Sequence, residues 1–209
     1  GGPWSVGFSF SNNFPEQIVV KKNPIFRLED LKKYDDSTRF LADPFFLKVK
    51  DTFYLFVEHQ KLKGGASIAL LTSTDGLHYT PKGTVLKEKF HLSYPQVFTY
   101  KNEFYMLPES QQSHQVLLYK AKKFPYEWAI CDTLIKNIQL KDPSIYLSDT
   151  LNILMACDKK QTLHMYQADS LFGNWKLHAQ PNVLTGSESR PGGRITAYKN
   201  RLILPIQNA

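Results

Sequence analysis

Short apolar runs separated by polar turns repeat along most of this chain. Two of them, residues 41–47 and 53–58, flank the polar stretch 48–51, which predicts a β-hairpin. Asp43 and Glu58 lie at equal distances from the centre of that turn. Antiparallel pairing would therefore place the two carboxylates opposite each other at the open end of the hairpin. Helical periodicity is weak throughout.

The same hairpin recurs three more times. A residue followed by proline opens each unit, and these residues are Asp43, Tyr94, Asp142 and Arg190, at intervals of 51, 48 and 48 residues. A third apolar run and a short closing run follow in each of the first three units. Four strand signals in a period of roughly 40 to 50 residues are typical of a β-propeller blade.

The pattern therefore predicts an all-β fold, a five-bladed β-propeller of glycosidase-like type. We expect this chain to supply about three and a half blades and an N-terminal closing strand. Residues 1–39 would form the closing strand, from 17–20 or 23–26, and a crossover, because a propeller must cover its terminal edges. Residues 40–209 would form blades 1 to 4 as one domain.

The fourth unit is predicted to be incomplete, with strands at 195–198 and 201–206 only. Such a unit would leave an open sheet edge. We therefore expect a fragment of a longer protein, with a fused or partner domain C-terminal to residue 209.

Composition narrows the function classes. With 42% hydrophobic and 22% charged residues, the chain has the make-up of an ordinary globular domain, and no apolar run approaches the roughly 18 residues of a transmembrane segment. The formal charge of +7 favours anionic ligands, but the lysines are scattered, so we expect no nucleic-acid partner. Cys131 and Cys157 have no metal or redox spacing, and we interpret them as buried thiols of a cytoplasmic protein.

The residues before the prolines are ring positions, because the innermost strands of a propeller surround one axis. The positions that answer them on the second strands are Glu58, Glu109, Cys157 and Pro205. Each proline removes a backbone donor and is expected to hold the preceding residue extended.

Four acids are the candidate catalytic residues: Asp43, Glu58, Glu109 and Asp142. Paired carboxyl groups with separated pKa values are the usual means of acid–base chemistry on glycosidic bonds. The alternative for each is structural, because a carboxylate can also accept hydrogen bonds from amides of a neighbouring blade.

Six further residues are candidates for substrate binding: His91, Ser93, Tyr94, Glu188, Arg190 and Arg194. The two arginines straddle a Gly-Gly pair that permits close approach, and guanidinium groups suit phosphate or carboxylate. Their alternative is pairing with the acids across the channel, and that of His91 is a structural hydrogen bond. The remaining histidines show no ligand spacing, so we expect no metal, and we expect no cofactor.

Taken as a set, several of these motifs resemble the N-terminal domain of the glucosamine inositolphosphorylceramide transferase family. The motifs are Ala42-Asp43-Pro44-Phe45, Tyr54-Leu55-Phe56-Val57-Glu58, Ser73-Thr74-Asp75-Gly76, His91-Leu92-Ser93-Tyr94-Pro95, Tyr105-Met106-Leu107-Pro108-Glu109, Leu118-Tyr119-Lys120-Ala121 and Arg190-Pro191-Gly192-Gly193-Arg194. The resemblance covers about residues 40–207. It also extends to bacterial proteins similar to sugar formyltransferase fusions, which implies a role in glycan or lipopolysaccharide biosynthesis.

More remotely, the Asp-Pro strand starts are similar to those of five-bladed arabinanase- and xylosidase-type glycosidases. In that family a blade-1 aspartate is the base, a later aspartate tunes pKa values and a glutamate is the acid. The resemblance implies the first role for Asp43 and the second for Asp142, and leaves Glu109 and Glu188 as competitors for the acid.

The leading hypothesis is a carbohydrate-active enzyme that transfers a glycosyl group or handles a phosphosugar or nucleotide sugar. The channel carboxylates would act as acid and base, and Arg190 and Arg194 would hold an anionic group. The alternatives are a glycoside hydrolase and a non-catalytic module that binds a glycan or docks a fused enzyme.

Overall fold

Three four-stranded antiparallel sheets form the body of the protein. The structure is a computed structural model that describes residues 6–8 and 27–208. The sheets contain β1 (Thr38–Val49), β2 (Thr52–Lys61), β3 (Ser67–Ser73) and β4 (Thr80–Leu86); β5 (Ser93–Tyr100), β6 (Glu103–Glu109), β7 (Gln115–Lys123) and β8 (Glu127–Lys136); and β9 (Leu140–Leu147), β10 (Asn152–Asp158), β11 (Thr162–Ala168) and β12 (Lys176–Thr185). Within each sheet, strands that follow one another in sequence are neighbours. We call them sheets I, II and III.

The fourth repeat forms an interrupted hairpin. Its strands are β13 (Arg190–Pro191), β14 (Thr196–Tyr198), β15 (Arg201–Ile203) and β16 (Ile206–Gln207), and β13 pairs with β16 while β14 pairs with β15. The only helical segments in the described part are α1 (Leu28–Lys32) and the 3-10 turn η1 (Gln111–Ser113).

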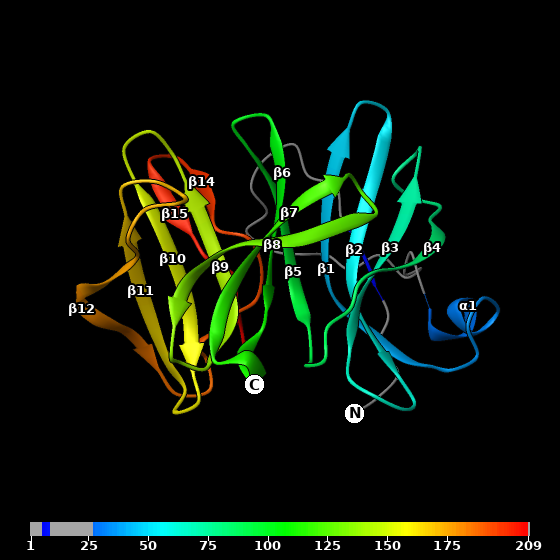
Figure 1. Ribbon diagram of the computed structural model, residues 1–209, viewed down its shortest axis with the longest axis horizontal. Coiled ribbons are helices and arrows are strands. Elements are labelled where there is room, and N and C mark those ends of the chain that lie inside the picture. Colours follow the sequence, from blue (N-terminus) through cyan, green and yellow to red (C-terminus); the bar gives the residue numbers. More distant parts are fainter. Residues whose placement is uncertain (1–5, 9–26, 209) are drawn as a thin grey trace.

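The sheets are arranged radially. In Figure 1 the first strands β9, β5 and β1 lie toward the middle, β12 and β4 lie at the left and right edges, and β8 crosses in front of β5. β1 contacts β5, β5 contacts β9, and β9 contacts β13, so the first strand of each repeat faces the shared interior. This is the propeller-like arrangement expected from the repeats. The described sheets do not close a ring, so the count of five blades stays a prediction.

Two apolar layers hold neighbouring sheets together. Phe56 and Leu70 of sheet I pack with Val97 and Met106 of sheet II, and a second cluster joins sheets II and III in the same way. The second strand of each sheet is covered on both faces. Its sequence is therefore a continuous apolar run and does not alternate between apolar and polar residues. The core is therefore the set of spaces between sheets.

The predicted strands and turns of the first three repeats match the structure closely, but the strand predicted at 201–206 is divided into β15 and β16, which pair with different strands. The β1–β2 turn is at Lys50 and Asp51, as the polar stretch 48–51 indicated. The described part of residues 1–39, within which a crossover was predicted, contains α1. The candidate closing strands at 17–20 and 23–26 lie outside the described residues.

The exposure of the two cysteines agrees with the sequence prediction at Cys157 and differs from it at Cys131. Cys157 is buried, as predicted, but Cys131 is exposed on β8 because this outermost strand has one face toward solvent.

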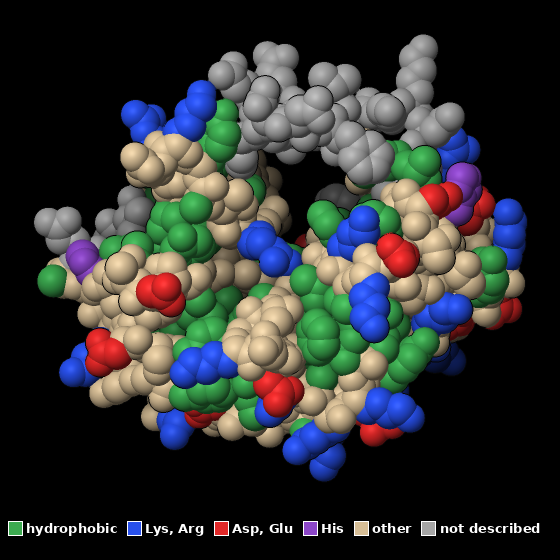
Figure 2. Space-filling model, turned by 90° about the horizontal axis from the view of Figure 1, so that it is seen from above, with side chains coloured by type: hydrophobic (Ala, Val, Ile, Leu, Met, Phe, Trp, Pro, Cys, Tyr) green, Lys and Arg blue, Asp and Glu red, His purple; other side chains and the backbone are tan. Residues whose placement is uncertain are grey.

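Lysine and arginine side chains are spaced around the face shown in Figure 2 rather than gathered in one stripe. Of the helices in residues 6–8 and 27–208, none is long and apolar enough to cross a membrane.

Candidate active site

A β-bulge occurs at the same place in each of the three sheets. The pairing of β1 with β2 passes from Ala42–Glu58 to Phe45–Phe56, so Asp43 and Pro44 together face a single residue. The same two-against-one count occurs at residues 94–95 of β5 and 142–143 of β9. Bulges redirect side chains and are frequent next to active sites. Here they turn one ring residue per sheet out of the ladder.

The backbone at these bulges differs from the expected extended form. Asp43, Tyr94 and Asp142 have φ angles of 49°, 48° and 51°, in the left-handed region. Proline does restrict the preceding residue, but the bulge geometry overrides that preference. A non-glycine residue in this region carries strain, and such strain often accompanies functional sites.

The residues opposite the bulges form a second ring. Glu58 pairs with Ala42, Glu109 with Ser93, Cys157 with Lys141, and Gln207 with Arg190. The first three are the predicted second-strand positions. In the fourth repeat the prediction of Pro205 is wrong, because β13 and β16 form a separate short ladder in which Gln207 pairs with the ring residue Arg190 itself, whereas the other three pair with the residue before the ring residue.

Asp43 and Glu58 form one carboxyl pair. Their side chains are hydrogen-bonded to each other. Asp43 Oδ2 also accepts a hydrogen bond of 3.2 Å from the backbone N–H of Tyr94, and Glu58 Oε1 lies 3.3 Å from His91 Nε2. The prediction that these acids meet at the open end of the hairpin is therefore confirmed by their contact, although the bulge sets them one position apart in register.

Asp142 and Glu109 form a second pair across sheets II and III. Glu109 Oε2 accepts a 3.2 Å hydrogen bond from the backbone N–H of Asp142, and the two side chains are also hydrogen-bonded. Two nitrogens of Arg190, Nε and Nη2, each lie 2.7 Å from Asp142 Oδ2, and Gln207 Nε2 donates to the same oxygen at 3.0 Å. Three donors thus converge on one carboxylate oxygen.

Burial separates the protonation states of the acids. It raises the pKa of Glu58 to about 8, with the charge of Asp43 as a second cause, and it raises the pKa of Asp43 to about 6. Burial and the charge of Asp142 raise the pKa of Glu109 as well. Burial also raises the pKa of Asp142, but the Arg190 guanidinium opposes that rise. In the first pair, Asp43 therefore takes the charge and Glu58 holds the proton at neutral pH. The Arg190 guanidinium on Asp142 favours the same division between Asp142 and Glu109.

A cavity of about 480 Å³ brings most of these groups together. Its wall contains six of the predicted catalytic or binding residues: Asp43, Glu58, His91, Ser93, Glu109 and Arg190. Gln207 also lines it, and the apolar part of the wall comes from Val6 and the strand segment 40–42. Groups from sheets I and II and from the fourth repeat therefore meet in one space, although Asp43 and Gln207, for example, are 164 residues apart in sequence.

The other predicted site residues lie elsewhere. Asp142 is 1% exposed and sits behind Arg190 rather than on the cavity wall. The Tyr94 hydroxyl donates to the carbonyl of Gly193 at 2.9 Å and lies 2.8 Å from Ser144 Oγ, so it connects sheets II and III with the fourth repeat.

Two predicted binding residues are kept from the cavity wall. Arg194 donates to the carbonyls of Val97 (2.8 Å) and Phe46 (3.4 Å), and burial lowers its pKa. The structure thus does not bring it together with Arg190 around one ligand. Glu188 is exposed and is not part of the wall.

Gln207 is the site residue that sequence reasoning missed. Nothing in the local pattern marks it, since its role depends on the register of a two-residue strand. Among the described residues, no group of three or more His, Cys, Asp or Glu side chains is arranged to hold a metal ion.

Several solved structures with this fold are glycoside hydrolases. One is the exo-β-1,3-galactanase from Phanerochaete chrysosporium, crystallised with β-1,3-galactotriose (TM-score 0.66, 14% identity, covering 81% of this chain and 42% of that one). Another is a family 117 glycoside hydrolase from Zobellia galactanivorans (TM-score 0.60, 14% identity, covering 89% and 63%). A thermostable family-43 glycoside hydrolase also matches, with a TM-score of 0.59 and 14% identity over 75% of this chain and 61% of that one. At these identities the likeness shows the fold, a propeller-like all-β architecture.

The relatives found by sequence are named as a transferase, whereas the similar solved structures are glycoside hydrolases. Proteins named glucosamine inositolphosphorylceramide transferase 1 from Oryza sativa subsp. japonica and Arabidopsis thaliana are each 33% identical, over 198 and 227 residues. The matches cover 89% and 96% of this chain but only 26% and 30% of those proteins. The family model of the N-terminal part of that transferase matches residues 11–209. This chain therefore belongs to the glucosamine inositolphosphorylceramide transferase 1 N-terminal family.

Proposed function

We propose that the cavity binds a sugar and transfers a glycosyl group to a hydroxyl acceptor, with Asp43 as general base and Glu109 as general acid. The observation that carries this proposal is the presence, on one cavity wall, of a partly exposed aspartate and a buried glutamic acid whose pKa burial raises to about 8. General acid–base catalysis needs such a pair with separated pKa values at the working pH.

The roles follow from the pKa values and contacts. With a pKa of about 6, Asp43 is ionised at neutral pH and keeps enough basicity to accept a proton. Its Oδ2 is oriented by the Tyr94 amide, and Glu58 supplies a neutral neighbour that does not repel the charge. Glu109 holds a proton because burial and the adjacent Asp142 charge disfavour its ionised form.

In the proposed step, one bond to the anomeric carbon forms as another breaks. The acceptor hydroxyl gives its proton to Asp43 while its oxygen bonds to the anomeric carbon. The bond from that carbon to the leaving-group oxygen breaks with its electron pair on that oxygen, which takes the proton of Glu109.

Arg190 can contribute positive charge at the leaving group, although Asp142 already accepts from two of its nitrogens. That ion pair offsets much of the guanidinium charge. We therefore propose that the proton of Glu109, rather than the charge of Arg190, stabilises the leaving group. The pair of arginines in the sequence had instead suggested a phosphate site.

The relatives support transfer in particular, since the proteins that share this domain are named as a transferase. Hydrolysis is the second candidate, supported by the glycoside hydrolases that share the fold and by the neutral carboxyl groups in the cavity. In hydrolysis a water takes the place of the acceptor hydroxyl and Asp43 and Glu109 keep their roles.

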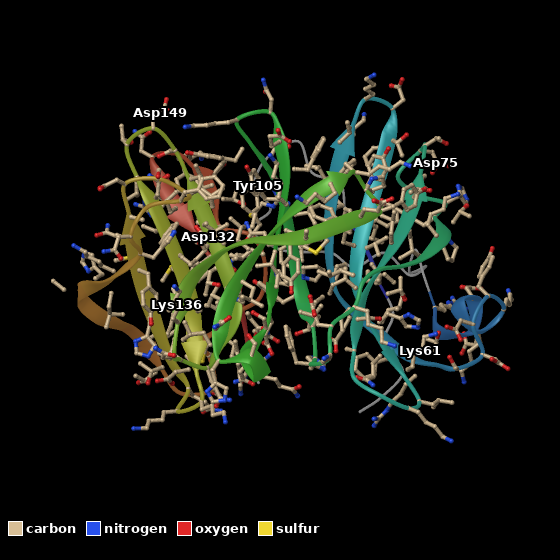
Figure 3. All side chains as sticks on the ribbon, in the orientation of Figure 1. Lys61, Asp75, Tyr105, Asp132, Lys136 and Asp149 are labelled. Carbon is tan, nitrogen blue, oxygen red and sulfur yellow. The ribbon has the colours of Figure 1, made fainter. Side chains whose placement is uncertain are left out.

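Turnover assays with single-atom replacements test the proposal. We would assay the chain against nucleotide sugars with hydroxyl acceptors and against aryl glycosides, and compare Asp43→Asn and Glu109→Gln. Both variants should lose roughly 10²- to 10⁴-fold in kcat while still binding the sugar. Matched controls are Asp149→Asn and Glu127→Gln, since both residues are exposed. Asp149 lies at the β9–β10 turn (Figure 3), whereas Asp142 is near the start of β9.

The outcomes separate the candidate functions. A new glycosidic bond supports transfer, and release of free sugar supports hydrolysis. Sugar binding without turnover would contradict catalysis and favour the glycan-binding or docking module, in which the acids serve only the contacts between sheets.

A further inference from the structure

The C-terminal strand β16 brings an uncharged amide into the acid cluster. Gln207 lines the cavity, and its Nε2 donates to Asp142 Oδ2 (3.0 Å) and to the carbonyl of Pro191 (2.8 Å). The side-chain nitrogen of glutamine has two N–H groups. Both are therefore committed, one to the carboxylate and one to the strand that carries Arg190.

Asp142 is held from three sides. It is 1% exposed, Arg190 and Gln207 both donate to its Oδ2, and its own backbone N–H donates to Glu109. Buried carboxylates persist only where such donors compensate for lost hydration. Every described donor to Oδ2 comes from the fourth repeat, and Glu109 approaches from sheet II.

The one proton of this pair can sit on either acid. The charged groups around the pair are Arg190 on β13, Lys141 next to Asp142 on β9, and the Asp43–Glu58 pair of sheet I. Hydrogen bonds to the charged form of one acid favour that form, so the donors on Asp142 leave the proton to Glu109. Arg190 and Gln207 thus decide which acid of the pair can donate.

We propose that Gln207 is a positioning residue that, together with Arg190, fixes Asp142 as a carboxylate and thereby keeps the shared proton on Glu109. The role of that proton in transfer rests on the proposed function, but its location does not. The fourth repeat, which lacks an acid at this position, then acts on the site through the amide of its last described strand.

The titration of Asp142 tests this assignment without any need for turnover. We would record carboxyl ¹³C NMR titrations of aspartate-labelled chain, assign Asp142 with Asp142→Asn, and compare Gln207→Met with the parent. Methionine keeps the length of the side chain and removes both donors. Loss of one hydrogen bond to a charged group should raise the midpoint of Asp142 by about one pH unit, a tenfold gain in proton affinity.

Two further variants keep the test decisive. Gln207→Glu preserves shape and adds a negative charge, so it should raise the midpoint more than Gln207→Met does. Asn208→Met places the same side chain at the exposed neighbouring position and should leave the midpoint unchanged. Equal midpoints in the parent and in either folded Gln207 variant would overturn the proposal.

Activity then separates this inference from the proposed function. In an active chain, the Gln207 variants should lower kcat with little change in KM, because fewer molecules carry the proton on Glu109. A shifted Asp142 titration in a chain without turnover supports the positioning role and contradicts the proposed function. Turnover with an unshifted Asp142 titration supports the proposed function and contradicts the positioning role of Gln207.

Discussion

Replacement of Glu58 by glutamine should change how the stability of this protein depends on pH. Glutamine has the shape of a protonated glutamic acid, so it can still donate to Asp43 and accept from His91, which lies 3.3 Å from Glu58 Oε1. It cannot ionise. The variant therefore isolates the cost of keeping a carboxyl group protonated at this buried position, where the side chain of Glu58 is 8% exposed.

The magnitude follows from the pKa of Glu58 in the two states. The group ionises near its ordinary value of 4.5 when the chain is unfolded and near about 8 in the native protein. Between these values the native state binds more protons than the unfolded state, so the free energy of unfolding falls as pH rises. Each pH unit in this window costs about 1.4 kcal/mol, which gives a loss of about 3 kcal/mol between pH 5 and pH 7. Below pH 4.5 the stabilisation is fully present.

Urea unfolding measures this difference directly. Tryptophan fluorescence of the parent and of Glu58→Gln would be followed at pH 5 and pH 7, and the two free energies of unfolding compared. The parent should lose about 3 kcal/mol more than the variant between these pH values. Glu127→Gln, at an exposed position of β8, should behave as the parent does.

Equal pH dependence in the parent and in Glu58→Gln would refute the reasoning. It would mean that Glu58 ionises at an ordinary pKa in the native protein. Glu58 would then not be the neutral neighbour that leaves the negative charge to Asp43 at neutral pH.

Three other replacements test the contacts that join the repeats. Arg190→Met should destabilise the protein by about 3–5 kcal/mol in urea unfolding, because it leaves the buried Asp142 carboxylate without its ion pair, and adding Asp142→Asn should recover much of the loss. Tyr94→Phe should cost about 1–3 kcal/mol by removing the hydroxyl that bonds Gly193 and Ser144, whereas Tyr126→Phe at an exposed position should cost nothing measurable. Gly192→Ala should lower stability and shift the Asp142 titration, because the added Cβ would lie 3.0 Å from Gln207 N; a variant with parental stability would contradict the tight β13–β16 approach.

The sequence alone determined the repeated unit and its strands. Four Xaa-Pro positions at nearly constant spacing, with apolar runs between polar turns, are local signals that survive in any environment, and they placed the hairpins and the first three ring residues correctly. They also marked Glu58, Glu109 and Cys157 as equivalent, because antiparallel pairing carries register from one strand to the next.

Only the tertiary structure decided what those residues do. The left-handed bulges, the separation of Arg194 from the cavity and the entry of Gln207 depend on contacts between sheets that no local period encodes. Protonation depends on them most. The pKa of a carboxyl group is set by its burial and by charges brought near it from distant repeats, so one residue type has a raised pKa of about 6 at Asp43 and forms an ion pair with an arginine at Asp142.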